Sequence, residues 1–211
     1  FDPLGTERHV NLLDPLGQRI SIFVTQGSAQ PALDLERLEK LIMECDIVVL
    51  NIISYTKQLI KLIEKHQKPI WTDLHDYNLE NQYHQPYIEA ANYIFVSSDN
   101  LPEYHETMLQ WMSQGKELIV CTHGSGGATA LTKTGEWIEL PIISDYKFKD
   151  ANGAGDSFFS GFLYAYLNGK SIIDCMKYAT ILGGLCISSY ELAHEKLSAE
   201  LVEQHFLKYY N

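Results

Sequence analysis

The chain has 211 residues, of which 45% are hydrophobic, and this length suits one domain with a sizeable core. Sixteen basic and 27 acidic residues give a formal net charge of -11, and an acidic chain without a basic stripe argues against nucleic acid as a partner. No apolar run approaches the roughly 18 to 20 residues of a membrane span and no signal segment opens the chain, so we expect a cytoplasmic protein without membrane partners.

Most of the chain before residue 122 alternates strand and helix patterns. A Pro-Gly turn is predicted at 14–17, and Asp34 is the expected N-cap of the first helix. The expected strands are 18–25, 46–51, 69–73, 93–96 and 117–122, and the expected helices are 34–42, 55–66, 87–91 and 102–113. The near-continuous apolar run at 46–51 is typical of a strand buried on both faces. Strand-helix units of this length predict a parallel sheet with helices on both sides.

After residue 122 the pattern changes. Segments 127–132 and 136–140 read as a β-hairpin, and three helices are expected at 154–168, 171–188 and 198–209, the last capped by Ser198. In an open parallel sheet, ligands bind beyond the carboxyl ends of the strands. Functional residues are therefore expected in the loops that follow the expected strands.

The most informative stretch is 149–162, where a turn-forming segment runs into an apolar helix. Gly153 and Gly155 allow a tight bend and leave no Cβ between a ligand and the backbone N–H groups. The first N–H groups of the helix that follows have no partner within it, which is typical of an anion site. Asp156, in the first turn, could take a proton from a hydroxyl beside that site, as phosphoryl transfer requires. The alternative is that Asp156 only stabilises the helix N-terminus.

Residues 150–156, D-A-N-G-A-G-D, resemble the D-T-x-G-A-G-D signature of the ribokinase-like (PfkB) carbohydrate and nucleoside kinases, with Ala151 where the family usually has Thr. The resemblance implies an α/β, ribokinase-like three-layer sandwich with a mainly parallel central sheet and a β-hairpin before the catalytic helix. It also implies an enzyme that transfers the γ-phosphoryl group of ATP, with Mg²⁺, to a hydroxyl of a small-molecule sugar or nucleoside. By this resemblance Asp156 is the general base, and the amides of Gly153, Ala154 and Gly155 form the anion hole.

Two further motifs resemble those of the same family. Thr122, Gly124 and Gly127 match its T-x-G-x-x-G segment, which contacts nucleotide, although glycines at a hairpin entry would give the same pattern. Asn100 and Glu103 match its N-x-x-E motif, which holds the magnesium and phosphate network, and oxygen ligands suit Mg²⁺. An ordinary helix-capping arrangement is the alternative for this pair.

The resemblance implies roles for three more positions and sets the expected domain organisation. Thr180 falls in the helix where the family packs adenine. Asp150 and Asn152 fall where some relatives bind a monovalent cation, although both residue types also favour turns. No stretch resembles the N-terminal strands that carry the family's acceptor-binding residues. We therefore expect residues 1–211 to be a single kinase core that lacks the N-terminal substrate-binding and lid portion. Without the lid portion, the sequence does not show whether the protein forms a homodimer.

Two alternatives from other functional classes stay open. Asp73, His75 and Asp76 follow a strand and could hold a divalent metal for hydrolysis, although a D-x-H-D cluster also suits a turn or a pocket wall. The other alternative is a non-catalytic nucleotide-binding protein or an inactive fragment. The four scattered cysteines, without C-x-x-C spacing, are expected to be reduced and mostly buried.

Overall fold

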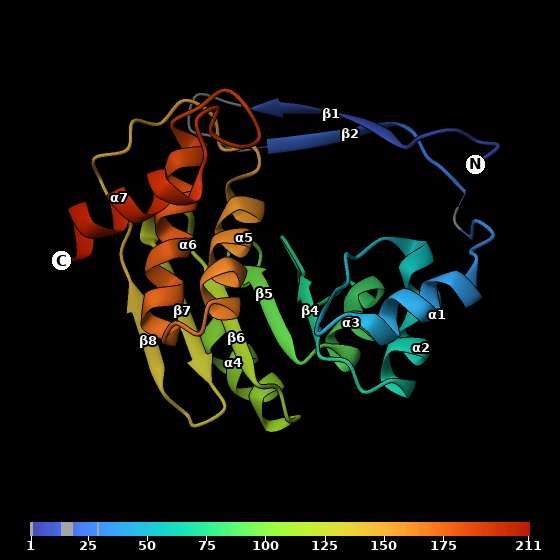
Figure 1. Cartoon of the computed structure of the whole chain (residues 1–211). Coiled ribbons are helices and arrows are strands. Elements are labelled where there is room, and N and C mark those ends of the chain that lie inside the picture. The colour runs from blue at the N-terminus through green and yellow to red at the C-terminus, as the bar shows by residue number, and fades with distance from the viewer. Residues whose placement is uncertain (1, 14–18, 29) are drawn as a thin grey trace. The chain divides into compact units, whose positions relative to one another are not determined.

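A computed structural model describes residues 2–13, 19–28 and 30–211. The chain divides into two compact units, residues 1–70 and 71–211, and each is described by itself (Figure 1). The turn predicted at 14–17 lies outside the described residues. The single kinase core expected over 1–211 stays a prediction.

The first unit contains a two-stranded antiparallel sheet and two short helices. The sheet is formed by β1 (Arg8–Leu13) and β2 (Arg19–Thr25). The helices are α1 (Leu35–Glu44) and α2 (Ile60–Lys65), and β3 (Val48–Val49) lies between them in the chain. Asp34 is the N-cap of α1 as predicted, since its side chain accepts a hydrogen bond from the Arg37 N–H.

Three predictions for this unit need correction. β1 was not expected as a strand, and it is stabilised by backbone pairing with β2. The helix expected at 55–66 begins as a 3₁₀ turn, Ser54–Leu59, and becomes α-helical only from Ile60. The strand expected at 46–51 is reduced to β3, and Val49 is 44% exposed, so this strand is not buried on both faces. Composition identified an apolar extended segment, but it could not set the extent of its pairing.

The second unit is built on strands β4 (Ile70–Asp73), β5 (Tyr93–Ser97), β6 (Leu118–Thr122), β7 (Ala128–Thr132) and β8 (Trp137–Leu140). The strand order is β4-β5-β6-β7-β8. β4, β5 and β6 are parallel, and β7 and β8 add antiparallel to one edge. The predicted hairpin is therefore confirmed. The loops after β4, β5 and β6 all leave the sheet at the carboxyl ends of its parallel strands.

Helices cover both faces of this sheet, as expected from the alternating pattern (Figure 1). α5 (Ala154–Leu167) packs on the face that carries Trp71 and Phe95, where the buried Phe162 ring lies 5.2 Å from the Phe95 ring. The short α3 (Gln85–Ala90) follows β4, and α4 (Tyr104–Ser113) contacts β6 and β7. α6 (Ile172–Ile187) packs along α5, and α7 (Ala199–Tyr210) packs on α6.

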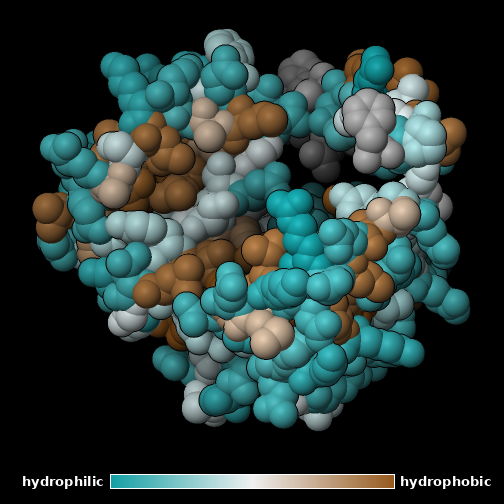
Figure 2. Space-filling model, turned by 45° about the vertical axis from the view of Figure 1, so that its right-hand side comes forward, coloured by the Kyte–Doolittle hydropathy of each residue, from teal (hydrophilic) through white to brown (hydrophobic). Residues whose placement is uncertain are grey.

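The helix cap at Ser198 and the burial of the cysteines agree with the predictions from the sequence. Ser198 caps α7 as predicted, by accepting a hydrogen bond from the Leu201 N–H. All four cysteines are free, and three of them are buried. Within residues 2–13, 19–28 and 30–211, every helix is too short or too polar to cross a membrane. Figure 2 shows a mostly hydrophilic face with separate apolar patches.

Candidate active site

Hydrogen bonds tie together the three loops that follow β4, β5 and β6. The Ser97 N–H donates to the His75 carbonyl at 2.6 Å, and the Asn100 Nδ2 donates to the Asp76 carbonyl at 3.2 Å. The Ser98 N–H donates to the Thr122 carbonyl at 2.9 Å. The parallel register therefore brings three segments that are distant in sequence to one edge, where ligands bind in open α/β sheets.

The N-terminus of α5 has the geometry of an anion site. Gly153 is the N-cap, with φ of 77°, in the left-handed region that favours glycine. A Cβ at this position would lie 2.6 Å from the Leu192 carbonyl oxygen, so only glycine fits. Among the residues that the structure describes, the N–H groups of Gly153 and Gly155 have no hydrogen-bond acceptor, whereas the Ala154 N–H donates to the Ala151 carbonyl at 3.1 Å. The free donors and the helix dipole favour a negatively charged group.

Asp156 lies beside two residues that the sequence had suggested as ligands of a hydrolytic metal, as part of a turn or as a pocket wall. One ligand atom from each of Asp73, His75 and Asp156 lies within 4.8 Å of the other two. Asp156 and His75 are exposed, and Asp73 is partly buried. The third member of the cluster is therefore Asp156, from a helix more than 80 residues away in sequence, where the sequence had suggested Asp76.

Asp73 is held at the end of β4 by its own loop. Its Oδ1 accepts the His75 N–H at 2.8 Å, and its Oδ2 lies 3.6 Å from His75 Nδ1. The side chain is only 19% exposed, and burial is the main cause that raises the pKa of the Asp73 carboxyl above its ordinary value of 3.8. The nearby Asp156 charge acts in the same direction, while His75 opposes it.

We expect Asp73→Asn to stabilise the fold at neutral pH. Because the folded-state pKa of Asp73 is raised, the native state is weakened as the pH rises through that pKa and the carboxylate ionises. The urea midpoint of the variant should therefore exceed that of the parent at pH 7, and the gap should close near pH 3. Asp76→Asn, at an exposed carboxyl in the same loop, is the control and should show no such gap. A variant less stable than the parent at pH 7 would contradict this account.

Asn100 and Glu103 have the oxygen chemistry that Mg²⁺ prefers. Glu103 is the N-cap of α4, but its side chain makes no capping hydrogen bond, and the Asn100 amide is bonded to Asp76 rather than to the helix. Neither side chain therefore makes the hydrogen bond that an ordinary helix cap would require. The Asn100 Oδ1 and the exposed Glu103 carboxylate are hard oxygen ligands that fit Mg²⁺ bound partly through water.

The glycine-rich loop after β6 turns sharply into β7. Gly127 has φ of 94°, and a Cβ there would overlap the Leu140 carbonyl, so glycine is required. The Gly127 carbonyl accepts the His123 N–H at 2.8 Å, which closes the turn. The hairpin-entry role is thus present, and nucleotide contact by Thr122, Gly124 and Gly127 stays a prediction.

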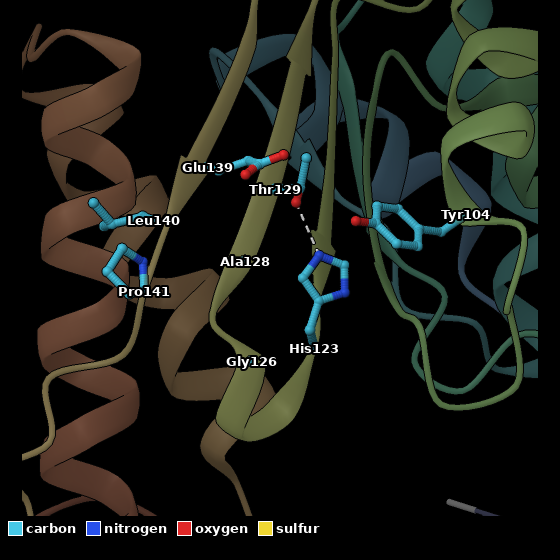
Figure 3. Close-up of a pocket in the computed structure, with 8 residues that line it drawn as sticks. All are labelled: Tyr104, His123, Gly126, Ala128, Thr129, Glu139, Leu140 and Pro141. Atoms are coloured by element: carbon cyan, nitrogen blue, oxygen red, sulfur yellow. Dashed lines mark hydrogen bonds between the residues drawn. The ribbon is translucent and has the colours of Figure 1, made fainter.

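A cavity of about 350 Å³ borders this loop on the α4 side of the sheet (Figure 3). His123 is hydrogen-bonded to Ser98 Oγ and Thr129 Oγ1, both at 2.9 Å, and its ring lies 4.5 Å from that of Tyr104. Burial is the main cause that lowers the pKa of His123. Sequence reasoning missed this network, although a His inside a glycine-rich loop was a visible signal. The cavity is lined by Tyr104, His123, Gly126, Ala128, Thr129, Glu139, Leu140 and Pro141.

The remaining predicted residues have local partners of their own. The Asp150 Oδ1 accepts the Asn152 N–H at 2.7 Å, so the predicted turn chemistry is present. Thr180 is 9% exposed, and its hydroxyl donates to the Met176 carbonyl at 2.9 Å within α6. On the next turn of α6, the Tyr146 ring occupies the space that a Cβ at Gly184 would need. The adenine and cation roles stay predictions.

The fold and this site together define a ribokinase-like α/β protein. A microbiome-derived acarbose kinase, Mak1, superposes with a TM-score of 0.84 over 95% of this chain and 69% of that one, at 25% identity. Ribokinase from Arabidopsis thaliana, solved with ribose and ATP, superposes with a TM-score of 0.77 over 97% of this chain and 70% of that one, at 20% identity. The second likeness concerns the fold alone.

The pfkB family carbohydrate kinase model matches residues 12–198, and the chain belongs to this family. Among curated relatives, the acarbose 7(IV)-phosphotransferase of Actinoplanes sp. is 27% identical over 85% of this chain and 61% of its own length. The 5-dehydro-2-deoxygluconokinase of Geobacillus thermodenitrificans is 31% identical over 47% of this chain and 29% of its own length. The chain thus spans less than two thirds of the length of these relatives.

Proposed function

We propose that the protein transfers the γ-phosphoryl group of ATP to a hydroxyl of a carbohydrate. The observation that carries this proposal is the pairing of Asp156 with free backbone N–H groups at the N-terminus of α5. Such a pairing supplies a base for the acceptor hydroxyl beside donors for the phosphoryl charge. Family membership and the two relatives named for acarbose favour a sugar over a nucleoside as the acceptor.

In the proposed reaction, Asp156 takes the proton of the acceptor hydroxyl, whose oxygen forms the new bond to the γ-phosphorus while the bond to ADP breaks. The N–H groups of Gly153 and Gly155 donate to the oxygens of the transferred group, and the α5 dipole adds to their effect. Mg²⁺, when bound, would neutralise phosphate charge. Asn100 and Glu103 are the residues proposed to hold it.

The nucleotide is proposed to extend from this anion site along the loop that carries Thr122, Gly124 and Gly127. The proposal is supported by the hydrogen bond from the Ser98 N–H to the Thr122 carbonyl, which joins the loops after β5 and β6. Roles for Thr180 near the base, and for a monovalent cation near Asp150 and Asn152, belong to the same proposal.

The test is ATP consumption by the chain with Mg²⁺ across a panel of sugars, oligosaccharides and nucleosides. Phosphorus NMR of the product identifies the acceptor and the hydroxyl that is phosphorylated. We expect turnover that depends on a carbohydrate. Nucleotide binding without turnover on any acceptor would instead favour the non-catalytic alternative, and turnover only with nucleosides would overturn the assignment to carbohydrate.

A further inference from the structure

Two carboxylates, those of Asp73 and Asp156, lie close together in this site, and among the described residues only His75 forms an ion pair with either of them. Among the residues that the structure describes, neither Asp73 nor Asp156 forms an ion pair with a lysine or arginine. The Oδ1 of Asp73 has one hydrogen bond, from the His75 N–H, but no donor lies within hydrogen-bond distance of its Oδ2. Two carboxylates this close repel each other, and a bound cation would relieve that repulsion.

The spacing of the ligand atoms in this cluster suits a small cation. His75 Nδ1 lies 3.6 Å from Asp73 Oδ2, which is too long for a hydrogen bond. For tetrahedral ligands about 2.1 Å from a zinc-sized ion, neighbouring ligand atoms are about 3.4 Å apart, close to this separation. The third ligand atom, on Asp156, lies within 4.8 Å of both, and its exposed side chain can rotate to close the set.

The donor set selects the kind of ion. Zn²⁺ and similar borderline cations favour a site made of one imidazole nitrogen and two carboxylates, whereas Mg²⁺ prefers oxygen ligands alone. Two carboxylates also balance the charge of a divalent ion.

We propose that Asp73, His75 and Asp156 bind a divalent cation of the zinc class, and that the bound ion inhibits the kinase by occupying its base. The inhibitory half rests on the proposed function of Asp156. A carboxylate that coordinates the ion cannot accept the acceptor's proton, and the ion occupies the position that the acceptor hydroxyl needs. Inhibition is therefore competitive with the acceptor and not with MgATP.

Binding is tested without any enzymatic reaction, by titrating the EDTA-treated chain with Co²⁺ in excess Mg²⁺ and following visible absorption. We expect one Co²⁺ ion with a tetrahedral nitrogen and oxygen spectrum, displaced by Zn²⁺. His75→Asn should lower Co²⁺ affinity by about tenfold or more. Asn suits this test because His75 has φ of 53°, a left-handed conformation that Asn tolerates. His105→Asn, at an exposed histidine outside the cluster, is the control and should bind Co²⁺ like the parent.

Two results would overturn the proposed metal site. One is equal Co²⁺ affinity in His75→Asn and the parent. The other is intense near-ultraviolet bands from cobalt-thiolate bonds, which would place the ion on a cysteine. Asp73→Asn provides a second variant at the cluster if His75→Asn does not fold, as judged by circular dichroism, and it should weaken Co²⁺ by a similar factor. Unchanged affinity in Asp73→Asn would equally overturn the site.

Inhibition is tested in the kinase assay, with each variant compared with its own turnover in the absence of Zn²⁺. We expect the Zn²⁺ concentration for half inhibition to rise about tenfold or more in His75→Asn, and to rise with acceptor concentration in the parent. Activation by Zn²⁺, or inhibition that is equal in both proteins, would overturn the inhibitory role. Absence of turnover with every acceptor while the Co²⁺ spectrum is present would refute the proposed kinase activity and leave the metal site standing.

Discussion

Asp156→Asn is expected to abolish most acceptor-dependent ATP turnover and to leave the fold intact. A positioned general base contributes about 10²- to 10⁴-fold, so the rate of phosphoryl transfer should fall by that factor at saturating acceptor. Asp156 is exposed, and none of its side-chain atoms forms a hydrogen bond or ion pair with the rest of the described chain. The melting temperature should therefore change little, and stopped-time assays of product formation give the rate.

The matched control is Asp76→Asn, which removes a carboxylate from the neighbouring loop outside the three-residue cluster. Its turnover should remain close to that of the parent. Nucleotide affinity, measured by calorimetry with a non-hydrolysable ATP analogue, should be retained in both variants, because the base acts on the acceptor. Undiminished turnover in Asp156→Asn would refute the proposed mechanism.

Gly153→Ala is expected to damage both stability and activity. An alanine at φ of 77° is strained, and its Cβ would lie 2.6 Å from the Leu192 carbonyl oxygen. Together the strain and the overlap should cost on the order of 3 kcal/mol of the free energy of unfolding. Because the backbone must shift to accommodate the methyl group, the N–H donors also move. Removal of one such donor lowers turnover by about 10²-fold or more.

Gly155→Ala, two residues further on, is the control, because it makes the same Gly-to-Ala change at a position that does not need a left-handed conformation. Gly155 does not have a positive φ, and a Cβ there would meet nothing within 4 Å. Since alanine is the better helix former by about 1 kcal/mol, this variant should be as stable as the parent or more so. Urea unfolding of the three proteins checks the comparison. Equal stability of Gly153→Ala and the parent would show that the turn does not need a left-handed residue.

Local patterns in the sequence predicted most of the secondary structure of the second unit. The strand pattern at 93–96, the hairpin around 127–140 and the helix after Gly153 all appear close to the expected bounds. These elements depend on short-range periodicity and on capping or turn residues, which can be recognised in one sequence. β1 and the shortened β3 were not predictable in this way, because their extent depends on pairing with other segments.

The sequence by itself determined the family resemblance, the glycine turn and the place of Asp156 at the start of a helix, because these features lie within one continuous stretch. Only the tertiary structure decided that Asp73 and His75 lie beside Asp156, where the sequence had grouped them with Asp76. That grouping follows from the parallel register of β4 and β5 and from the packing of α5 on the sheet. Spatial neighbours that are distant in the chain are set by long-range packing, and no local pattern of residues encodes them.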